Sequence, residues 1–283
     1  MRSAAGAAAL VLVVLAALTG AGLLVWHNLA PDWDAVQIEA ERARRLGYAA
    51  AGTPLPGTPD LADLAGRLAA AKVSLGAPVF IRIFKREFEL ELWLLRQGRF
   101  ERFAVYPVCR WSGRLGSKLA EGDGQTPEGF YTVDAKALNP NSRWHRSFNL
   151  GFPNAFDRAH GRTGSFIMVH GGCASIGCFA MTDPVVDEIW RLVTAALSGG
   201  QARFHVHVFP FRMTDENLAQ RSASPWAPFW AELKRGYDAF ESVRLPPRIA
   251  VCNGRYTVTP IGAFRDVGHE IANSCINLTG NRE

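Results

Sequence analysis

One short segment combines a histidine, a glycine-rich loop and a cysteine, the residue types that nucleophilic acyl transfer needs. His170 ends an apolar run, and Cys178 follows it after a loop that contains Gly171, Gly172 and Gly177. A cysteine attacks as its thiolate, which a nearby imidazole or a helix N-terminus favours. Because glycines let the chain turn back on itself, the two side chains can meet. Cys178 is therefore a candidate nucleophile and His170 its candidate base.

The residues next to Cys178 are suited to stabilising a reaction intermediate. Gly177 lets the backbone approach a substrate carbonyl, and the amides of Gly177 and Cys178 are a candidate oxyanion hole. A helix is predicted directly after the loop, with Asp183 as its cap and Pro184 as its first residue.

Three other interpretations of these residues stay open. The histidine and the cysteine can be inert parts of the core. A disulfide between Cys173 and Cys178 would block the nucleophile. Zinc is the third possibility, with His170, Cys173 and Cys178 plus His205 or His207 as ligands. The spacing fits no paired-ligand pattern, so we expect no metal, and we expect His205 and His207 to be structural.

The chain has five cysteines, and an odd number cannot all pair within one molecule. Cys252 and Cys275 are a candidate disulfide near the end of the chain. Cys109 lies in an apolar run and is expected to be a core thiol. At least one thiol is therefore free or pairs outside the molecule.

Apolar alternation predicts the elements that position this segment. From residue 79 the period is two, and apolar residues at 88, 90 and 92 alternate with three glutamates, which indicates a strand with one buried face. We predict a turn at Gly98 and further strands at 103–108, 130–133, 147–150, 166–170 and 204–209. The predicted fold class is α+β and β-rich, with flanking helices.

The N-terminal segment is predicted to be a membrane anchor helix, at residues 1–28. Residues 4–26 are apolar and uncharged, which is long enough to span a bilayer and longer than a signal-peptide core. Arg2 before the run, with Asp32 and Asp34 after it, favours a cytoplasmic N-terminus. A cleaved signal is the alternative, and both place the body of the protein outside the cytoplasm.

Changes in composition and periodicity divide the rest of the chain into three predicted segments. Residues 29–76 are predicted to be a helical spacer, with a charged helix at 37–48 and a second helix that Thr58 caps. Residues 77–212 are the predicted catalytic domain, and residues 213–283 a C-terminal helical extension. That extension ends in a hairpin, because Asn253-Gly254 is typical of a two-residue turn.

Charge and composition limit the classes of binding partner that can be expected. Apolar residues make up 48% and charged residues 20%, which excludes wholesale disorder. The net charge is +5, without a dense Lys/Arg stripe, so we expect no nucleic-acid partner.

Several separated motifs resemble the YkuD-type L,D-transpeptidase family, and more closely its YafK/DpaA-like subgroup. Residues 169–181 hold the family's His-Gly pair and its Ser-x-Gly-Cys string. Supporting stretches follow the family's order at 122–131, 152–157, 161–164 and 209–215. The resemblance covers about residues 77–260 and implies an L,D-transpeptidase-like catalytic core that needs no cofactor.

The resemblance implies acyl transfer on peptidoglycan stem peptides. In the family a cysteine attacks the L-centre carbonyl of meso-diaminopimelate, and an amine or water resolves the thioester. Cys178 then is the nucleophile, His170 the base and later acid, and the Gly171 carbonyl orients the imidazole. Ser175 and Gly177 shape the loop, and Ser175 also borders the substrate.

Two positions differ from the commonest family pattern. Ile176 replaces a histidine, and Ala180 replaces an arginine or asparagine. The subgroup shares both changes and resembles hydrolases that detach covalently bound outer-membrane lipoprotein from peptidoglycan. We therefore favour hydrolysis over cross-linking or protein attachment. A catalytically inactive wall-binding module is the alternative from another class.

Further residues are candidates for substrate binding. Arg158 and Arg162 can pair with a carboxylate, and surface arginines are the alternative interpretation. Thr126 and Pro127 belong to a glycine-rich loop that borders the groove in the family. The expected partners are stem peptides, peptidoglycan-bound lipoprotein and the membrane, and the expected location is the periplasm.

Overall fold

The computed structural model describes residues 32–264, 271 and 273–275, and the predicted anchor at residues 1–28 lies outside them. Among the helices of the described ranges, none has the length and apolar character to cross a bilayer. The chain falls into two compact units, Met1–Ala40 and Glu41–Glu283. The second unit holds every strand that the structure describes.

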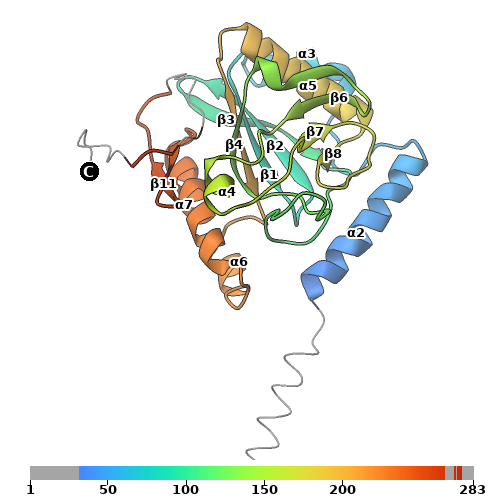
Figure 1. The fold of residues 1–283 in the computed structure, drawn as a ribbon. Helices are drawn as coiled ribbons and strands as arrows, with labels where there is room; N and C mark the ends of the chain where they lie inside the picture. The colour runs from blue at the N-terminus through green and yellow to red at the C-terminus, as the bar shows by residue number, and fades with distance from the viewer. Residues whose placement is uncertain (1–31, 265–270, 272, 276–283) are drawn as a thin grey trace, which may run out of the picture. The chain divides into compact units, whose positions relative to one another are not determined.

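The larger sheet forms the centre of the second unit (Figure 1). Its strand order is β3-β2-β1-β9-β4, with β1 and β9 parallel and the other neighbours antiparallel. These strands are β1 (Val79–Phe84), β2 (Glu89–Arg96), β3 (Arg99–Pro107), β4 (Gly129–Val133) and β9 (Phe204–Phe209). The predicted strands at 103–108, 130–133 and 204–209 correspond to β3, β4 and β9.

The prediction of one buried face on β2 is wrong, because both faces are covered. Five consecutive residues of β2 are buried, including Glu91. Glu91 is accommodated by ion pairs with Arg82 at 2.7 Å and Arg212 at 2.9 Å. Buried charges persist when they are paired and hydrogen-bonded in this way.

The smaller sheet carries the predicted catalytic segment. Its order is β5-β6-β7-β8, and its strands are β5 (Leu138–Ser142), β6 (His145–Asn149), β7 (Met168–His170) and β8 (Phe179–Ala180). β7 and β8 are parallel, with His170 opposite Ala180. The strands predicted at 147–150 and 166–170 correspond to β6 and β7, with shifted ends.

Helices of the second unit flank the sheets, in agreement with the predicted mixed, β-rich fold. They are α3 (Leu64–Ala70), α4 (Ala155–Ala159), α5 (Asp183–Ser198), α6 (Asp215–Ala219) and α7 (Ala227–Val243), with short 3-10 turns η1 (Leu61–Asp63) and η2 (Ala135–Ala137). A further helix, α2 (Trp33–Ala50), begins in the first unit. The Thr58 cap is wrong: Asp60 caps η1 and Asp63 caps α3. Asp183 does not cap α5 either, since its carboxylate accepts the Gly172 N–H at 2.8 Å.

The C-terminal segment shares a hydrophobic core with the larger sheet. α7 lies against the hairpin of β10 (Arg248–Cys252) and β11 (Arg255–Thr259) (Figure 1). Phe130 of β4, Trp230 of α7 and Tyr256 of β11 belong to one buried cluster. The hairpin turn is the predicted one, and both Asn253 and Gly254 have positive φ.

The two histidines of β9 are part of the sheet, as predicted. His207 is fully buried, and its ring packs edge-on against Phe80 and Phe130 at centroid distances of 4.8 and 4.7 Å. Burial holds the pKa of His207 well below the usual histidine value. His207 is therefore a neutral core residue.

Candidate active site

Cys178 directly precedes β8 and is half-buried. The Met168 N–H donates to its sulfur at 3.4 Å, and the thiol donates to the Phe166 carbonyl at 3.5 Å. Burial raises the pKa of the Cys178 thiol, and the Met168 amide lowers it by a smaller amount. α5 begins only at Asp183, so the expected help from a helix N-terminus is absent. The resting group is a neutral thiol, which needs a base to become a nucleophile.

His170 ends β7 and has an imidazole oriented by its neighbour. Its Nδ1 lies 2.5 Å from the Gly171 carbonyl oxygen. Because a carbonyl only accepts hydrogen bonds, Nδ1 carries the hydrogen and Nε2 is the basic nitrogen of the neutral ring. Burial lowers the pKa of His170, and the bond to Gly171 opposes that shift. His170 is therefore poised as a neutral proton acceptor.

The structure brings His170 and Cys178 to one cavity of about 740 Å³. Apolar side chains that are unusually exposed for their type border it, with Ile176 at 90% and Phe166 at 72% exposure. The Trp144 ring lies beside the imidazole at a centroid distance of 5.9 Å. The cavity thus combines a thiol, a neutral base and an apolar rim.

Hydrogen bonds within the loop fix the backbone before Cys178. The Ser175 hydroxyl donates to the Cys178 carbonyl at 2.7 Å and accepts the Gly177 N–H at 3.2 Å. Gly177 has a φ of +149°, and a Cβ there would lie 3.2 Å from Ile167, so a side chain would strain the turn. Since its N–H already bonds to Ser175, Gly177 does not offer the oxyanion donor that we expected, which leaves the Cys178 N–H as the candidate.

Thr126 and Pro127 support the loop from behind, which corrects their predicted contact with substrate. Both are buried and neither borders the cavity. The Thr126 hydroxyl donates to the Cys178 carbonyl at 3.4 Å and accepts the Ser112 N–H at 3.0 Å. Ser112 in turn lies 3.2 Å from the Ser175 hydroxyl. Thr126 and Ser112 therefore position the backbone of the nucleophile.

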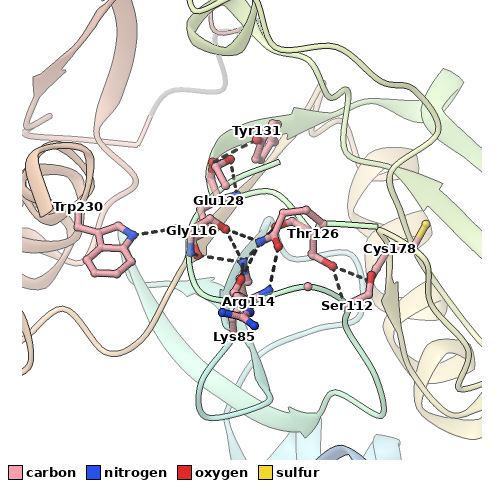
Figure 2. Close-up of polar contacts among 12 residues, drawn as sticks. Lys85, Ser112, Arg114, Gly116, Thr126, Glu128, Tyr131, Cys178 and Trp230 are labelled. Atoms are coloured by element: carbon pink, nitrogen blue, oxygen red, sulfur yellow. Dashed lines mark hydrogen bonds and ion pairs between the residues drawn. The ribbon is translucent and has the colours of Figure 1, made fainter. Parts of the chain in front are cut away.

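A buried lysine anchors this supporting loop (Figure 2). Lys85 Nζ pairs with Glu128 at 2.9 Å and donates to the carbonyls of Arg114, Gly116 and Thr126. The other Glu128 oxygen accepts the Trp230 indole N–H at 2.8 Å. We did not predict this network, although a lysine that ends an apolar strand is a usable signal, since a buried lysine requires partners.

The structure places Arg158 and Arg162 away from the Cys178 cavity and so does not bring these two predicted carboxylate-binding residues to the nucleophile. Arg162 is buried, pairs with Asp157 at 2.8 Å and stacks on Phe229. Arg158 donates to the Pro153 carbonyl and borders a separate cavity of about 230 Å³. Arg162 is occupied by an internal carboxylate, and Arg158 faces another part of the molecule.

The cysteine pairing leaves Cys178 free. Cys109 pairs with Cys173, and Cys252 pairs with Cys275, with Cα–Cα distances of 5.3 and 4.8 Å. Cys109 is therefore not a core thiol, and the alternatives that used Cys173 in a blocking disulfide or as a zinc ligand are contradicted. Across the described ranges, no three His, Cys, Asp or Glu residues are grouped to hold a metal.

Removing the disulfide of the catalytic loop is expected to lower both stability and activity. Cys109 and Cys173 are 64 residues apart, and closing a loop of that length stabilises by about 4 kcal/mol. The bond also ties the loop of Cys178 to the end of β3. The variant Cys109→Ser/Cys173→Ser should unfold at lower urea concentration and turn over at least about tenfold more slowly.

Cys252→Ser/Cys275→Ser is the matched control, because that disulfide closes a 23-residue separation outside the cavity. It should lose about 3 kcal/mol of stability and keep its turnover. Equal losses of turnover in the two variants would show that the first disulfide has no particular role at the site.

Sequence comparisons agree with this arrangement. A family model described as the L,D-transpeptidase catalytic domain, YkuD, matches residues 82–208, which include His170 and Cys178. The YafK protein of Escherichia coli strain K12, named as an L,D-transpeptidase homologue, is 46% identical over 197 residues. The match covers 70% of this chain and 78% of YafK, and YafK of Escherichia coli O157:H7 gives the same values.

The chain belongs to the YkuD family of L,D-transpeptidases. It is accordingly a peptidoglycan-acting enzyme of that family, as the resemblance implied. Among solved structures, the helical cell shape determining protein Pgp2 from Campylobacter jejuni is similar, with 18% identity and a TM-score of 0.39. That match covers 62% of this chain and 63% of Pgp2, less than two thirds of either.

Proposed function

We propose that this YkuD-family enzyme is a cysteine amidase. It hydrolyses an amide at the L-centre carbonyl of meso-diaminopimelate in peptidoglycan stem peptides and so releases covalently attached lipoprotein. One observation carries the proposal: the free thiol of Cys178 and the imidazole of His170, oriented by Gly171, border the same cavity.

The proposed reaction has two acyl-transfer steps. His170 Nε2 takes the thiol proton as the Cys178 sulfur attacks the carbonyl, and the Cys178 N–H stabilises the oxyanion. The imidazolium then gives that proton to the leaving amine as the C–N bond breaks, which leaves a thioester. In the second step water attacks the thioester carbon and His170 Nε2 takes a proton from it. The C–S bond then breaks and the imidazolium returns that proton to the sulfur, which gives a carboxylic acid and the free thiol of Cys178.

Two sequence differences near Cys178 favour hydrolysis over transfer to an amine. Ile176, at the rim of the cavity, is 90% exposed where the commonest family pattern has a histidine, and Ala180, which does not border the cavity, is fully buried where that pattern has a polar residue. The rim near Cys178 therefore offers fewer polar groups to hold an incoming amine. Transfer that makes a cross-link or attaches a protein is the second candidate function.

Product analysis distinguishes these outcomes. A fragment that begins near Asp32 is incubated with sacculi that carry attached lipoprotein, and the products are analysed by mass spectrometry. We expect intact protein to be released with a stem that ends in a free diaminopimelate carboxyl. New bridges between two diaminopimelate residues, without release, would identify the enzyme as a transpeptidase. Binding without any product would identify a wall-binding module.

We also propose that the enzyme works in the periplasm, held at the inner membrane by residues 1–28. The supporting observations are the long uncharged run in that segment and a substrate class found outside the cytoplasm. Fractionation of cells tests this: the full chain should sediment with membranes, and a chain without residues 1–28 should not.

The pH profile of turnover should report the lowered pKa of His170. The base acts as neutral imidazole, so protonation removes activity. Burial puts the pKa of His170 below the usual value of about 6.5, and activity should persist as pH falls past that value before it declines. The measurement is kcat/KM on a soluble stem peptide between about pH 4 and pH 8. An acid limb centred above the usual histidine value would contradict the neutral, buried base.

A further inference from the structure

Arg110 lies in register with the proposed catalytic base. Its backbone forms an antiparallel bridge with Ala180, with hydrogen bonds of 3.0 Å from the Arg110 N–H and 2.8 Å from the Ala180 N–H. Ala180 is in turn the parallel partner of His170. Residues that pair across strands have side chains on the same face of the sheet. His170, Ala180 and Arg110 therefore form one row across the smaller sheet.

The small side chain in the middle of this row lets both ends reach the cavity. Ala180 is fully buried and does not border the cavity, whereas His170 and Arg110 both do. The disulfide of the neighbouring Cys109 with Cys173 ties the Arg110 segment to the catalytic loop. Arg110 is thus held at a fixed place relative to Cys178.

Among the described residues, the guanidinium of Arg110 has no counter-ion. Within the part of the chain that the structure describes, its side chain makes no hydrogen bond or ion pair, although it is half-buried. The two other cations of the cavity are engaged: Lys118 pairs with Asp123 at 2.6 Å, and Arg143 lies over the Trp144 ring at 5.5 Å. A half-buried guanidinium favours an anionic partner, and a carboxylate fits it with two parallel hydrogen bonds.

We propose that Arg110 binds a carboxylate of the stem peptide and so determines specificity for an acidic substrate. This inference rests on the proposed amidase function, which supplies the stem peptide. Two groups offer this chemistry, the D-centre carboxylate of diaminopimelate and the α-carboxylate of the glutamate that precedes it. Arg110 acts on substrate binding and takes no part in the proton transfers of His170.

The experiment compares matched substrates and variants. The substrates are a synthetic stem peptide with both carboxylates free and two peptides in which one carboxylate at a time is amidated. The variants are Arg110→Ala, Arg110→Lys and the control Arg191→Ala, an exposed arginine of α5 outside the cavity. kcat and KM are measured for each combination of enzyme variant and peptide, and thermal melting confirms that the variants fold.

We expect Arg110→Ala to lower kcat/KM about 10- to 100-fold on the free peptide, mainly through KM, because a charged hydrogen bond is lost. Amidation of the recognised carboxylate should lower the wild-type value similarly and should leave Arg110→Ala unaffected. The other amidated peptide should behave like the free one, which identifies the carboxylate. Arg110→Lys should be intermediate, and Arg191→Ala should match the wild type.

An equal loss on the free and both amidated peptides would overturn the proposal, because a structural role of Arg110 would not depend on the substrate's charge. Wild-type turnover with no loss in Arg110→Ala would also overturn it, while the amidase function would stand. A wild-type enzyme that cleaves none of the peptides or sacculi would instead refute the amidase function itself.

Discussion

Replacement of Cys178 by alanine is expected to abolish turnover while the fold is kept. The reaction proposed here has no other nucleophile, so the rate should fall by roughly 10⁴-fold or more. Stability should change little, because the half-buried thiol makes two weak hydrogen bonds among the described residues, to the backbone of Met168 and Phe166. Turnover on purified sacculi and urea unfolding measure the two effects.

His170→Ala should give a similar loss, because the neutral thiol of Cys178 depends on a base. Residues that act as a unit give non-additive losses, so the double variant Cys178→Ala/His170→Ala should be no slower than either single one. Near-normal turnover of either single variant would refute the assigned mechanism. Additive losses would mean that the two residues work separately.

Replacement of Lys85 by methionine has the largest expected effect on stability. Lys85 is fully buried, and its loss leaves the Glu128 carboxylate without its ion pair. It also removes one hydrogen-bond donor from each of three carbonyls, which accept a second hydrogen bond from Gln125 Nε2. Breaking a buried pair in this way costs about 3–5 kcal/mol. Turnover should also fall, because Thr126 belongs to the same loop and supports the Cys178 carbonyl.

Two further variants make the Lys85 result specific. Lys136→Met removes an exposed lysine and should change neither stability nor turnover. Lys85→Met/Glu128→Gln removes both charges, so it should recover part of the stability that Lys85→Met loses. If Lys85→Met were as stable as Lys136→Met, the buried network would not anchor the loop.

The local features of the fold could be predicted because they depend on neighbours in the chain. Alternation of apolar residues locates β3, β4 and β9, and the Asn253-Gly254 pair locates the final hairpin, since each pattern reflects local geometry. The motif of His170 and Cys178 is local in the same sense. A strand, a glycine loop and a second strand bring them to one cavity.

Long-range pairing explains what could not be predicted. Cys109 and Cys173 are 64 residues apart, and nothing in the local sequence shows that they pair. Cys109 was therefore predicted to be a core thiol from its apolar neighbours alone. The alternation in the sequence placed Glu91 on a solvent face, because its partners are distant along the chain: Arg82 lies on β1 and Arg212 follows β9. The residues around Arg162 in the sequence do not show whether its side chain contacts substrate or the buried Asp157. Only the fold decides which partner a charge meets.

The apolar rim of the cavity also depends on the fold. Nothing in the composition of the loop shows that Ile176 is 90% exposed or that Phe166 lies at the same cavity. The sequence shows that Ile176 stands where the family usually has a histidine. It does not show that the Ile176 side chain borders the Cys178 cavity. The position of Arg110, in one row with Ala180 and His170, likewise follows from strand pairing.

The most direct test of the central claim is to trap the acyl-enzyme. The protein is mixed with a synthetic stem peptide, quenched with acid during turnover and digested, and the adduct is located by mass spectrometry. We predict the mass of the stem peptide without its leaving amine on the peptide that contains Cys178, removable by hydroxylamine and absent from Cys178→Ala. An adduct on another residue during turnover at the normal rate would contradict this mechanism. Normal turnover of the Cys178→Ala variant would contradict it as well.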